Sequence, residues 1–365
     1  MHSAACHDID LQKACKKCLL PEPFAQLNGD RLCQECSHEH PAPLKGDKAL
    51  ARVFEPIRGK YPYDCMVALS GGRDSAYALY IVKNVLKLNC LAFNHDNEMT
   101  HPQAIANMEN MCRNLNVDLV RIKSRRKLCT SIVADLIRAL AQFGPNVLKT
   151  ALCGPCNVGA YLGAKKLVAE HNIPVIVLGN SKEEKLPDTL RKPVRVRTTS
   201  QLFNPQGLFY VRAQINKLRH RLELSSSLTD SMNMRFAPKN DEPERQKLKA
   251  TSIVTLFSYI QWDRRRIITT IEDELGWQRP EGRTSSWRFD CQLIDFINYL
   301  WFKTYGYPKS FFGHVQMIRS GNMDRKEALD QLLEKNWGLL TDHMRTMLST
   351  TLGVEDKYVE RVESY

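Results

Sequence analysis

The sequence contains no run of about 18 apolar residues, the length that a membrane-spanning helix requires, so we expect no transmembrane segment. Its first residues, MHSAACHDIDLQKACKKC, lack the apolar core of a secretory signal peptide, and we therefore expect a cytoplasmic protein. In that reducing compartment its 12 cysteines are not expected to form a disulfide framework. Clustered cysteines then indicate metal or sulfur chemistry instead.

The composition has no extreme feature. With 43% hydrophobic and 25% charged residues, a collagen-like, coiled-coil or mainly disordered protein is excluded. Acidic residues are the scarcer charged class, 40 against 52 Lys and Arg, and the net charge of +12 favours an anionic partner such as a nucleotide, a phosphate or RNA. A length of 365 residues predicts two or three domains.

The chain divides by composition into four segments. They are a Cys- and His-rich segment (1–45), a segment of alternating apolar and amphipathic stretches (46–185), a basic insertion (186–250) and a region of helical periodicity (251–365). Within the second segment we expect strands at 63–69, 89–96, 117–123 and 173–180, and helices at 75–86, 101–115, 126–142 and 157–171. This alternation predicts an α/β fold with a doubly wound parallel sheet, preceded by a zinc knuckle and followed by a mostly helical C-terminal region.

The sharpest motif is Ser70-Gly71-Gly72-Arg73-Asp74-Ser75, between an expected strand and an expected helix. Glycines let the backbone approach a phosphate closely, and the N–H groups at a helix N-terminus form an anion site. The serine hydroxyls can add hydrogen bonds, and Asp74 can cap the helix or help to orient Mg²⁺. The motif has neither the Walker A spacing nor the GxGxxG dinucleotide pattern. The alternative is a Ser/Gly turn in which Asp74 is an ordinary N-cap.

YDCMVALSGGRDS resembles the SGGxDS signature of the PP-loop, or N-type, ATP pyrophosphatases. The resemblance implies an adenine nucleotide α-hydrolase-like fold and cleavage of ATP between its α and β phosphates. A carbonyl oxygen of the substrate is adenylated in this chemistry, and a sulfur or nitrogen nucleophile then displaces AMP.

The same resemblance implies which residues bind ATP. Those expected to hold the pyrophosphate are Ser70, Gly71, Gly72, Asp74 and Ser75, and those expected to border the adenine pocket are Ala68 and Leu69. Arg73 stands where such motifs often have Lys, and it keeps the positive charge with a different geometry.

Polar and small residues also follow two other expected strands. Asp96 and Asn97 end the second strand, where the family often places nucleotide-contacting residues, and Gly179 and Asn180 end the fourth. The carboxyl ends of parallel strands form the usual ligand edge of such a sheet. Ordinary turn chemistry is the alternative for all four.

Two CxxC pairs lie near the N-terminus. Cys15 and Cys18 are followed by fourteen residues and then by Cys33 and Cys36, a spacing close to that of zinc ribbons. Four cysteines leave no open position on zinc, so we expect a structural site, with a redox role for either pair as the alternative. Substitute ligands to consider are Cys6, His7, His38 and His40. The segment also resembles the knuckle ahead of some PP-loop domains, among them N-acetyl sugar amidotransferases and one group of tRNA-thiolating enzymes.

A second cysteine group begins an expected helix in the ATP domain. Cys153 and Cys156 form a CxxC within LCGPCN, and Cys291 lies far away in sequence. Three cysteines can ligate a 4Fe-4S cluster and leave one iron open, and the tRNA-thiolating PP-loop enzymes have such a pattern. The alternatives are a second zinc site, a persulfide relay and structural cysteines. Cys112, predicted to be core, and Cys129, in a basic neighbourhood, stay open as sulfur carriers.

The C-terminal stretches 274–291 and 305–329 resemble the corresponding part of the N-acetyl sugar amidotransferases. The resemblance suggests basic residues for an anionic substrate: Arg283, Arg288, Lys309, His314 and Arg319. A structural histidine is the alternative for His314. The sugar enzymes do not need an LCGPC motif, and the extra cysteines argue for sulfur in place of ammonia.

The leading hypothesis is therefore an ATP-dependent sulfurtransferase that replaces a carbonyl oxygen with sulfur and uses ATP, Mg²⁺, Zn²⁺ and a 4Fe-4S cluster. We expect a small, nucleotide-like anionic substrate, with tRNA as the second choice, and a sulfur-donor protein as a partner. The alternatives are an amidotransferase with a separate glutaminase, and a nucleic-acid-binding adaptor without turnover. A homodimer is one option for the quaternary state.

Overall fold

The computed structural model describes residues 13–38, 43–123, 127–144, 152–181, 212–219, 251–281 and 288–365. Four of the residues named above lie outside these ranges: Cys6, His7, His40 and Arg283. The expected basic insertion, 186–250, also lies outside them, except for 212–219, which are helical. The boundaries of the four segments stay predictions.

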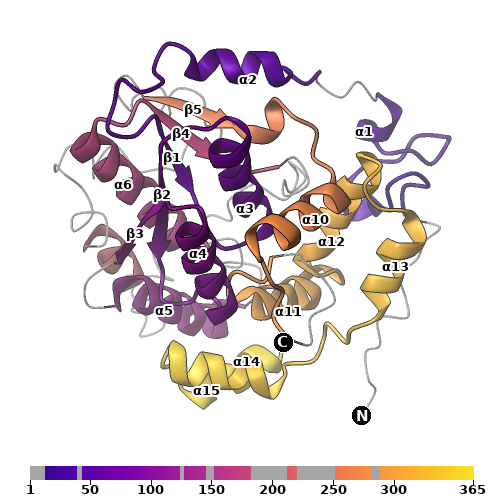
Figure 1. Cartoon of the computed structure of the whole chain (residues 1–365). Helices are drawn as coiled ribbons and strands as arrows, with labels where there is room; N and C mark the ends of the chain where they lie inside the picture. The colour runs from indigo at the N-terminus through magenta and orange to yellow at the C-terminus, as the bar shows by residue number, and fades with distance from the viewer. Residues whose placement is uncertain are drawn as a thin grey trace.

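The protein contains a five-stranded parallel sheet, on the left in Figure 1. Its strands, in spatial order, are β3 (Asp118–Lys123), β2 (Cys90–Asp96), β1 (Cys65–Ala68), β4 (Val175–Leu178) and β5 (Ser252–Thr255). The predicted α/β fold with a parallel sheet is confirmed, and all four expected strands are present. β5 falls in a region where the sequence pattern indicates helices, and it extends the sheet on the side of β4.

Helices connect the strands in the predicted order. They are α3 (Arg73–Tyr80, continued by a π-helical turn at Ile81–Val85), α4 (Pro102–Asn114), α5 (Leu128–Phe143) and α6 (Gly154–His171). Two glycines bring α6 close to β2, since a Cβ on Gly159 would lie 2.1 Å from the His95 ring and one on Gly163 would lie 2.8 Å from Phe93. The helix therefore runs antiparallel to β2, and its first turn extends past the carboxyl end of the sheet.

Three cysteines of this domain belong to the core, as the sequence predicts. Cys65 and Cys90 are register partners on β1 and β2, and Cys112 lies on α4. All three are buried, and burial raises the pKa of Cys90 and of Cys112 to about 12. These thiols are neutral near pH 7, which does not favour a role in sulfur transfer.

The C-terminal region is helical after β5. Its helices are η9 (Leu256–Ser258), α10 (Arg264–Leu275), α11 (Ile294–Tyr305), α12 (Lys309–Arg319), α13 (Arg325–Leu333), α14 (Asp342–Thr346, continued by a π-helical turn at Met347–Thr351) and α15 (Asp356–Glu363). α10 packs on α3 and α15 packs on α5. None of the helices in the described ranges is both long and apolar enough to cross a bilayer.

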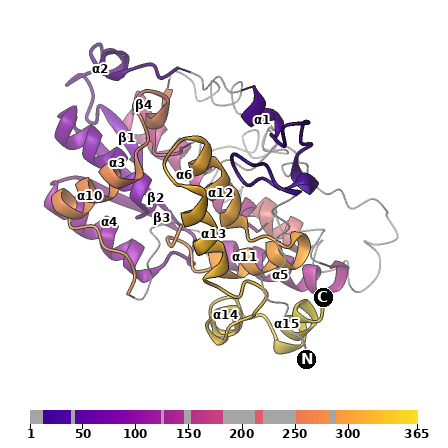
Figure 2. The same ribbon diagram turned by 90° about the vertical axis from the view of Figure 1, so that its right-hand side faces the viewer.

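The N-terminal knuckle lies beside α12 and α13 (Figure 2). It contains η3 (Glu22–Phe24) and α1 (Gln34–Ser37), and α2 (Asp47–Phe54) follows it. The Phe24 ring lies edge-on to Phe312, with 5.0 Å between ring centroids, and 5.3 Å from Tyr305. Edge-on aromatic pairs of this kind add to the burial of apolar surface, so the knuckle is packed against the C-terminal helices.

Candidate active site

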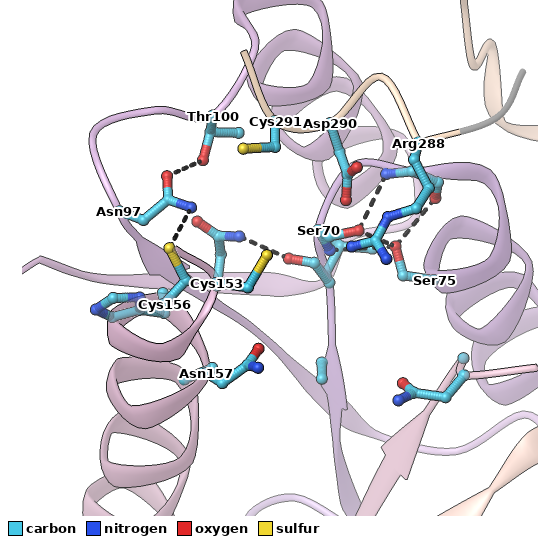
Figure 3. A pocket seen from close by; sticks show the side chains of 18 of the residues that line it. Ser70, Ser75, Asn97, Thr100, Cys153, Cys156, Asn157, Arg288, Asp290 and Cys291 are labelled. Atoms are coloured by element: carbon cyan, nitrogen blue, oxygen red, sulfur yellow. Dashed lines mark hydrogen bonds between the residues drawn. The ribbon is translucent and has the colours of Figure 1, made fainter. Parts of the chain in front are cut away.

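A cavity of about 520 Å³ lies at the carboxyl ends of the strands, where the strand order reverses between β1 and β4 (Figure 3). In doubly wound sheets this switch point is the usual place for a ligand. The predicted site residues that line the cavity are Ala68, Leu69, Ser70, Gly72, Arg73, Asp74, Ser75, Asn97, Cys153, Cys156, Gly179, Asn180, Arg288, Cys291 and Lys309. The structure thus brings together predicted residues from six separate stretches of the chain: 68–75, 97, 153–156, 179–180, 288–291 and 309.

Internal hydrogen bonds hold the loop after β1 in shape. The Ser70 N–H donates to Ser75 Oγ at 3.1 Å, and the Ser75 hydroxyl donates to the Gly72 carbonyl at 3.0 Å. The Gly72 N–H lies 3.3 Å from Ser70 Oγ, its acceptor. α3 begins at Arg73 with Gly72 as its N-cap and no side-chain cap. The N-terminal N–H groups of α3 are therefore not capped by a side chain, which suits the binding of an anion.

Two glycines of this region have no room for a side chain. Gly71 has a φ of +80°, and a Cβ there would lie 2.2 Å from the Ala104 carbonyl oxygen. A Cβ on Gly179 would lie 2.5 Å from the Asp74 carbonyl oxygen. The Gly71 carbonyl also accepts a hydrogen bond from Trp277 Nε1 at 2.9 Å. Gly71 therefore holds the loop against Ala104 and Trp277, on the side away from the cavity, and does not line the cavity itself.

Asp74 is not the N-cap that the turn interpretation predicts. It lies inside α3, where its Oδ1 accepts hydrogen bonds from Trp262 Nε1 at 3.0 Å and from Arg73 Nε at 3.1 Å. Burial raises the pKa of this carboxyl, and the nearby charge of Asp290 raises it further. The Arg73 guanidinium lies over the Trp262 ring, 4.9 Å from its centroid. Arg73 thus pairs with Asp74 at the base of the loop.

The three cysteines of the second group face one cavity. Cys153 and Cys156 begin α6, whereas Cys291 lies on a short segment that forms an antiparallel bridge with Thr100. Backbone hydrogen bonds from His101 to Asp290 (3.0 Å) and from Gln292 to Met99 (2.8 Å) hold this segment in place. Burial raises the pKa of Cys291, and the proximity of Cys156 and Cys153 raises it further.

Donor groups and a fourth cysteine contact the CxxC pair. Asn97 Nδ2 donates to Cys156 Sγ at 3.4 Å, and Lys309 Nζ lies 3.9 Å from Cys153 Sγ (Figure 3 shows the first). Cys129 Sγ lies 3.6 Å from Cys156 Sγ. The basic sequence around Cys129 indicates a reactive thiol, but the residue is buried. Its contact with Cys156 could not be recognised in the sequence.

Three other predicted residues lie elsewhere. Asp96 does not line the cavity, and its carboxylate accepts from Arg121 at 2.9 Å and from the Glu98 N–H at 3.0 Å. His314 is buried in α12, and burial together with two arginines lowers its pKa to about 4, so it is neutral at pH 7 and does not supply positive charge. Arg319 lies at the N-terminal cysteines, as described below.

Two of the polar cavity residues that were not predicted from the sequence bear on the chemistry of the site. Asp290 lies beside the loop 70–75, with its carboxylate 3.6 Å from the position of a Cβ on Gly72. Asn94, on β2, also lines the cavity. Asn94 begins the polar run 94–98 at the end of β2, and Asp290 directly precedes Cys291; only these positions mark them in the sequence.

The four N-terminal cysteines form a separate, closed cluster. The sulfur atoms of Cys15, Cys18, Cys33 and Cys36 all lie within 4.8 Å of one another, and the residues are buried. Among the described residues, this is the one group with three or more such ligand atoms so close together. Four converging thiols suit the predicted zinc and also an iron–sulfur centre, whereas His38 lies apart and bonds to Gln34 and Ser37.

Arg319 belongs to this cysteine cluster. Its Nη2 donates to Cys33 Sγ at 3.2 Å, and its Nη1 pairs with Glu35. Hydrogen bonds from the neighbouring cysteines lower the pKa of Cys33, and the charge of Arg319 contributes to the same effect. The Arg319 guanidinium is not one of the four sulfur ligands, but its positive charge lies beside them and stabilises negative charge on the thiolates.

No family model matches the chain. A stretch of 152 residues, 40% of the chain, is 30% identical to an uncharacterized protein of Methanocaldococcus jannaschii. This stretch spans 53% of that protein, so the chain covers about half the length of the curated relative that it matches. The name of the relative states no activity. The similarity therefore gives no information about the reaction of this protein.

Proposed function

We propose that this protein is an AMP-forming, ATP-dependent sulfurtransferase of the PP-loop type. One observation carries the proposal: the loop 70–75 and the thiols of Cys153, Cys156 and Cys291 line the same cavity. A phosphate-binding loop alone would serve many reactions. Three cysteines from distant parts of the chain, facing that loop, are what sulfur transfer to an activated substrate would use.

The chain supplies groups for each part of the activation step. The hydroxyls of Ser70 and Ser75 and the N-terminal N–H groups of α3 would bind the pyrophosphate part of ATP. The substrate carbonyl oxygen attacks the α-phosphorus, a C–O–P bond forms, and the bond to the β-phosphate oxygen breaks with release of pyrophosphate. Asp290, whose carboxylate lies beside Gly72, would hold Mg²⁺, because Asp74 is already bonded to Arg73 and Trp262.

In the second step, sulfur attacks the activated carbon, and the C–O bond breaks with release of AMP. Cys153, Cys156 and Cys291 fit a 4Fe-4S cluster by donor type and by their shared cavity, and they would hold it there; the cluster would supply the sulfur for transfer. Asn97 and Lys309 donate hydrogen bonds toward two of these sulfurs and would stabilise their negative charge.

Arg288 and Lys309 line the cavity and favour a small anionic substrate, with tRNA as the second choice. A sulfur-donor protein would reload the site. The ammonia-dependent amidotransferase is the second candidate, and it needs none of the three cysteines. The comparison of sulfide with ammonium as co-substrate therefore separates the two.

The test measures AMP and pyrophosphate released from radiolabelled ATP by the anaerobically purified protein. Ser70→Ala combined with Asp74→Asn should abolish AMP formation, because it removes a hydroxyl of the loop and the charge that pairs with Arg73. Ser349→Ala changes an exposed serine of the C-terminal region and serves as the control. AMP release by the double variant at the wild-type rate would contradict the assignment of the loop.

Sulfur transfer is tested with sulfide and a panel of nucleotides and tRNA, with products identified by mass spectrometry. Serine variants of Cys153, Cys156 or Cys291 should bind ATP but yield no thiolated product, whereas Cys112→Ala should retain activity. The wild type should be brown and absorb broadly near about 400 nm, as Fe–S thiolate centres do. Nitrogen incorporation from ammonium, unaffected by the serine variants, would favour the amidotransferase.

A further inference from the structure

Asn94, near the end of β2, is a buried amide whose nitrogen is hydrogen-bonded and whose oxygen has no partner among the described residues. The residue is 7% exposed and lines the cavity. Its Nδ2 donates to the Leu69 carbonyl at 2.8 Å. A carbonyl oxygen can only accept, so this bond identifies the nitrogen of the amide and leaves Oδ1 as an acceptor. Oδ1 has no hydrogen-bond partner among the described residues.

A buried acceptor without a partner is costly, and native proteins rarely keep one unless a ligand or water satisfies it. Neighbouring contacts connect Asn94 to both halves of the site. Leu69, which holds its nitrogen, directly precedes the phosphate loop, and Asn97, three positions later on the chain, bonds to Cys156. The bond to Leu69 also fixes the orientation of the amide before any ligand binds.

We propose that Asn94 Oδ1 accepts a hydrogen bond from an N–H group of a planar heterocycle in this cavity, either in the ring or on an exocyclic amine. The inference rests on the proposed function and deepens it, because it states what the ligand must carry. The same cavity is lined by Phe93, Ile176 and Leu178, whose apolar surfaces suit a flat ring better than a hydrated sugar. Two sources offer this chemistry: the 6-amino group of ATP, and a ring N–H beside the carbonyl that is to be activated.

A ligand without this N–H would leave Oδ1 buried and unpaired. Sites that present a buried hydrogen-bonding group reject such analogues far more strongly than apolar pockets do. We expect discrimination of about tenfold or more in the dissociation constant. Asn94 is then a specificity residue, and its bond to Leu69 is the device that orients it.

The experiment compares two pairs of probes by isothermal titration calorimetry. ATP is paired with purine riboside 5′-triphosphate, which lacks the 6-amino group, and UMP is paired with 3-methyl-UMP, which lacks the ring N–H. The wild type is compared with Asn94→Leu, which removes the acceptor, and with Asn94→Asp, which keeps an oxygen there but loses the donation to Leu69. Asn94→Ala replaces the leucine variant if the latter does not fold.

The wild type should prefer the N–H member of one pair, and Asn94→Leu should bind both members equally. Asn94→Asp keeps an acceptor but loses the bond to Leu69 that orients it, so it should show a smaller preference than the wild type. A preference within the ATP pair assigns the contact to adenine, and one within the UMP pair assigns it to the acceptor substrate. Equal binding within both pairs by the wild type, or a preference that survives in Asn94→Leu, overturns the inference. A wild type that binds neither triphosphate contradicts the proposed function itself.

Discussion

The sulfur atoms of Cys129 and Cys156 lie 3.6 Å apart, although one residue lies near the start of α5 and the other near the start of α6. Cys156 lines the cavity, whereas Cys129 is buried in the packing between the two helices. The hydrogen bond with Cys129 raises the pKa of Cys156, and burial raises it further. One thiol of the predicted CxxC pair is therefore in contact with a cysteine outside that pair.

Mild oxidation should join these two cysteines. A disulfide has an S–S bond of about 2 Å, so a rotation of side chains with little backbone movement would close the gap. Diamide takes two electrons and two protons from the thiols, and tryptic peptide mass spectrometry should identify a Cys129–Cys156 link. Cys129→Ala should not form it. Exclusive formation of a Cys153–Cys156 link in the wild type would contradict this expectation.

Arg319→Leu should weaken metal binding at the N-terminal cysteines by about tenfold to a hundredfold, the usual effect of losing a group that bonds to a metal ligand. The variant loses the hydrogen bond to Cys33 and the positive charge beside the thiolates. Competition with a chromophoric chelator measures the zinc affinity.

Arg325→Leu is the matched control for this measurement. Arg325 also contacts the knuckle, but through the carbonyl oxygens of Cys15 and Lys16 rather than through sulfur. It should change zinc affinity less than Arg319→Leu does. Equal effects of the two variants would mean that docking of the knuckle, and not charge at the sulfur, controls metal binding.

Alanine at Gly71 or Gly179 should destabilise the protein by about 1–3 kcal/mol and disturb ATP binding, because each Cβ would meet backbone rather than a movable side chain. Gly154→Ala provides the contrast, since a Cβ there meets nothing within 4 Å and the residue begins α6. It should leave stability unchanged or raise it by up to about 1 kcal/mol. Urea unfolding measures all three, and a loss of stability confined to Gly154→Ala would refute the packing described for the loop.

The stability of the protein should fall as the pH is lowered from 6.5 toward 4, in part because of His314. Burial, Arg264 and Arg73 lower its pKa from 6.5 to about 4. Over this interval the unfolded chain binds a proton that the folded protein does not, so protonation favours unfolding by up to about 3 kcal/mol.

His314→Gln should flatten this pH dependence, which urea unfolding at pH 4.5 and pH 7 measures. His343→Gln, at an exposed position of α14, is the control and should leave the dependence as in the wild type. The same slope in the wild type and in His314→Gln would show that another group is responsible.

Local sequence patterns were enough to predict the parallel sheet, the loop after its first strand and the cluster of N-terminal cysteines. The alternation of apolar runs and amphipathic stretches predicts a parallel sheet, because side-chain periodicity reports which faces are buried. Ser70–Ser75 sits between a strand and a helix, and the spacing of the four N-terminal cysteines is short enough for a compact metal site. Each of these signals lies within a few tens of residues, so the sequence by itself determined it.

Only the tertiary structure decided which distant residues share the cavity. Only the family resemblance predicted that Cys291 lies at this cavity. Backbone pairing of its segment with residues 99–101 holds it in that position. Cys129 contacts Cys156, Asn94 presents an unpaired oxygen, and Arg319 lies at the knuckle instead of the cavity. Such contacts depend on how helices pack across the sheet, and no periodicity or spacing along one segment contains that information. The burial that keeps His314 neutral arises in the same way, from elements brought together only in the folded protein.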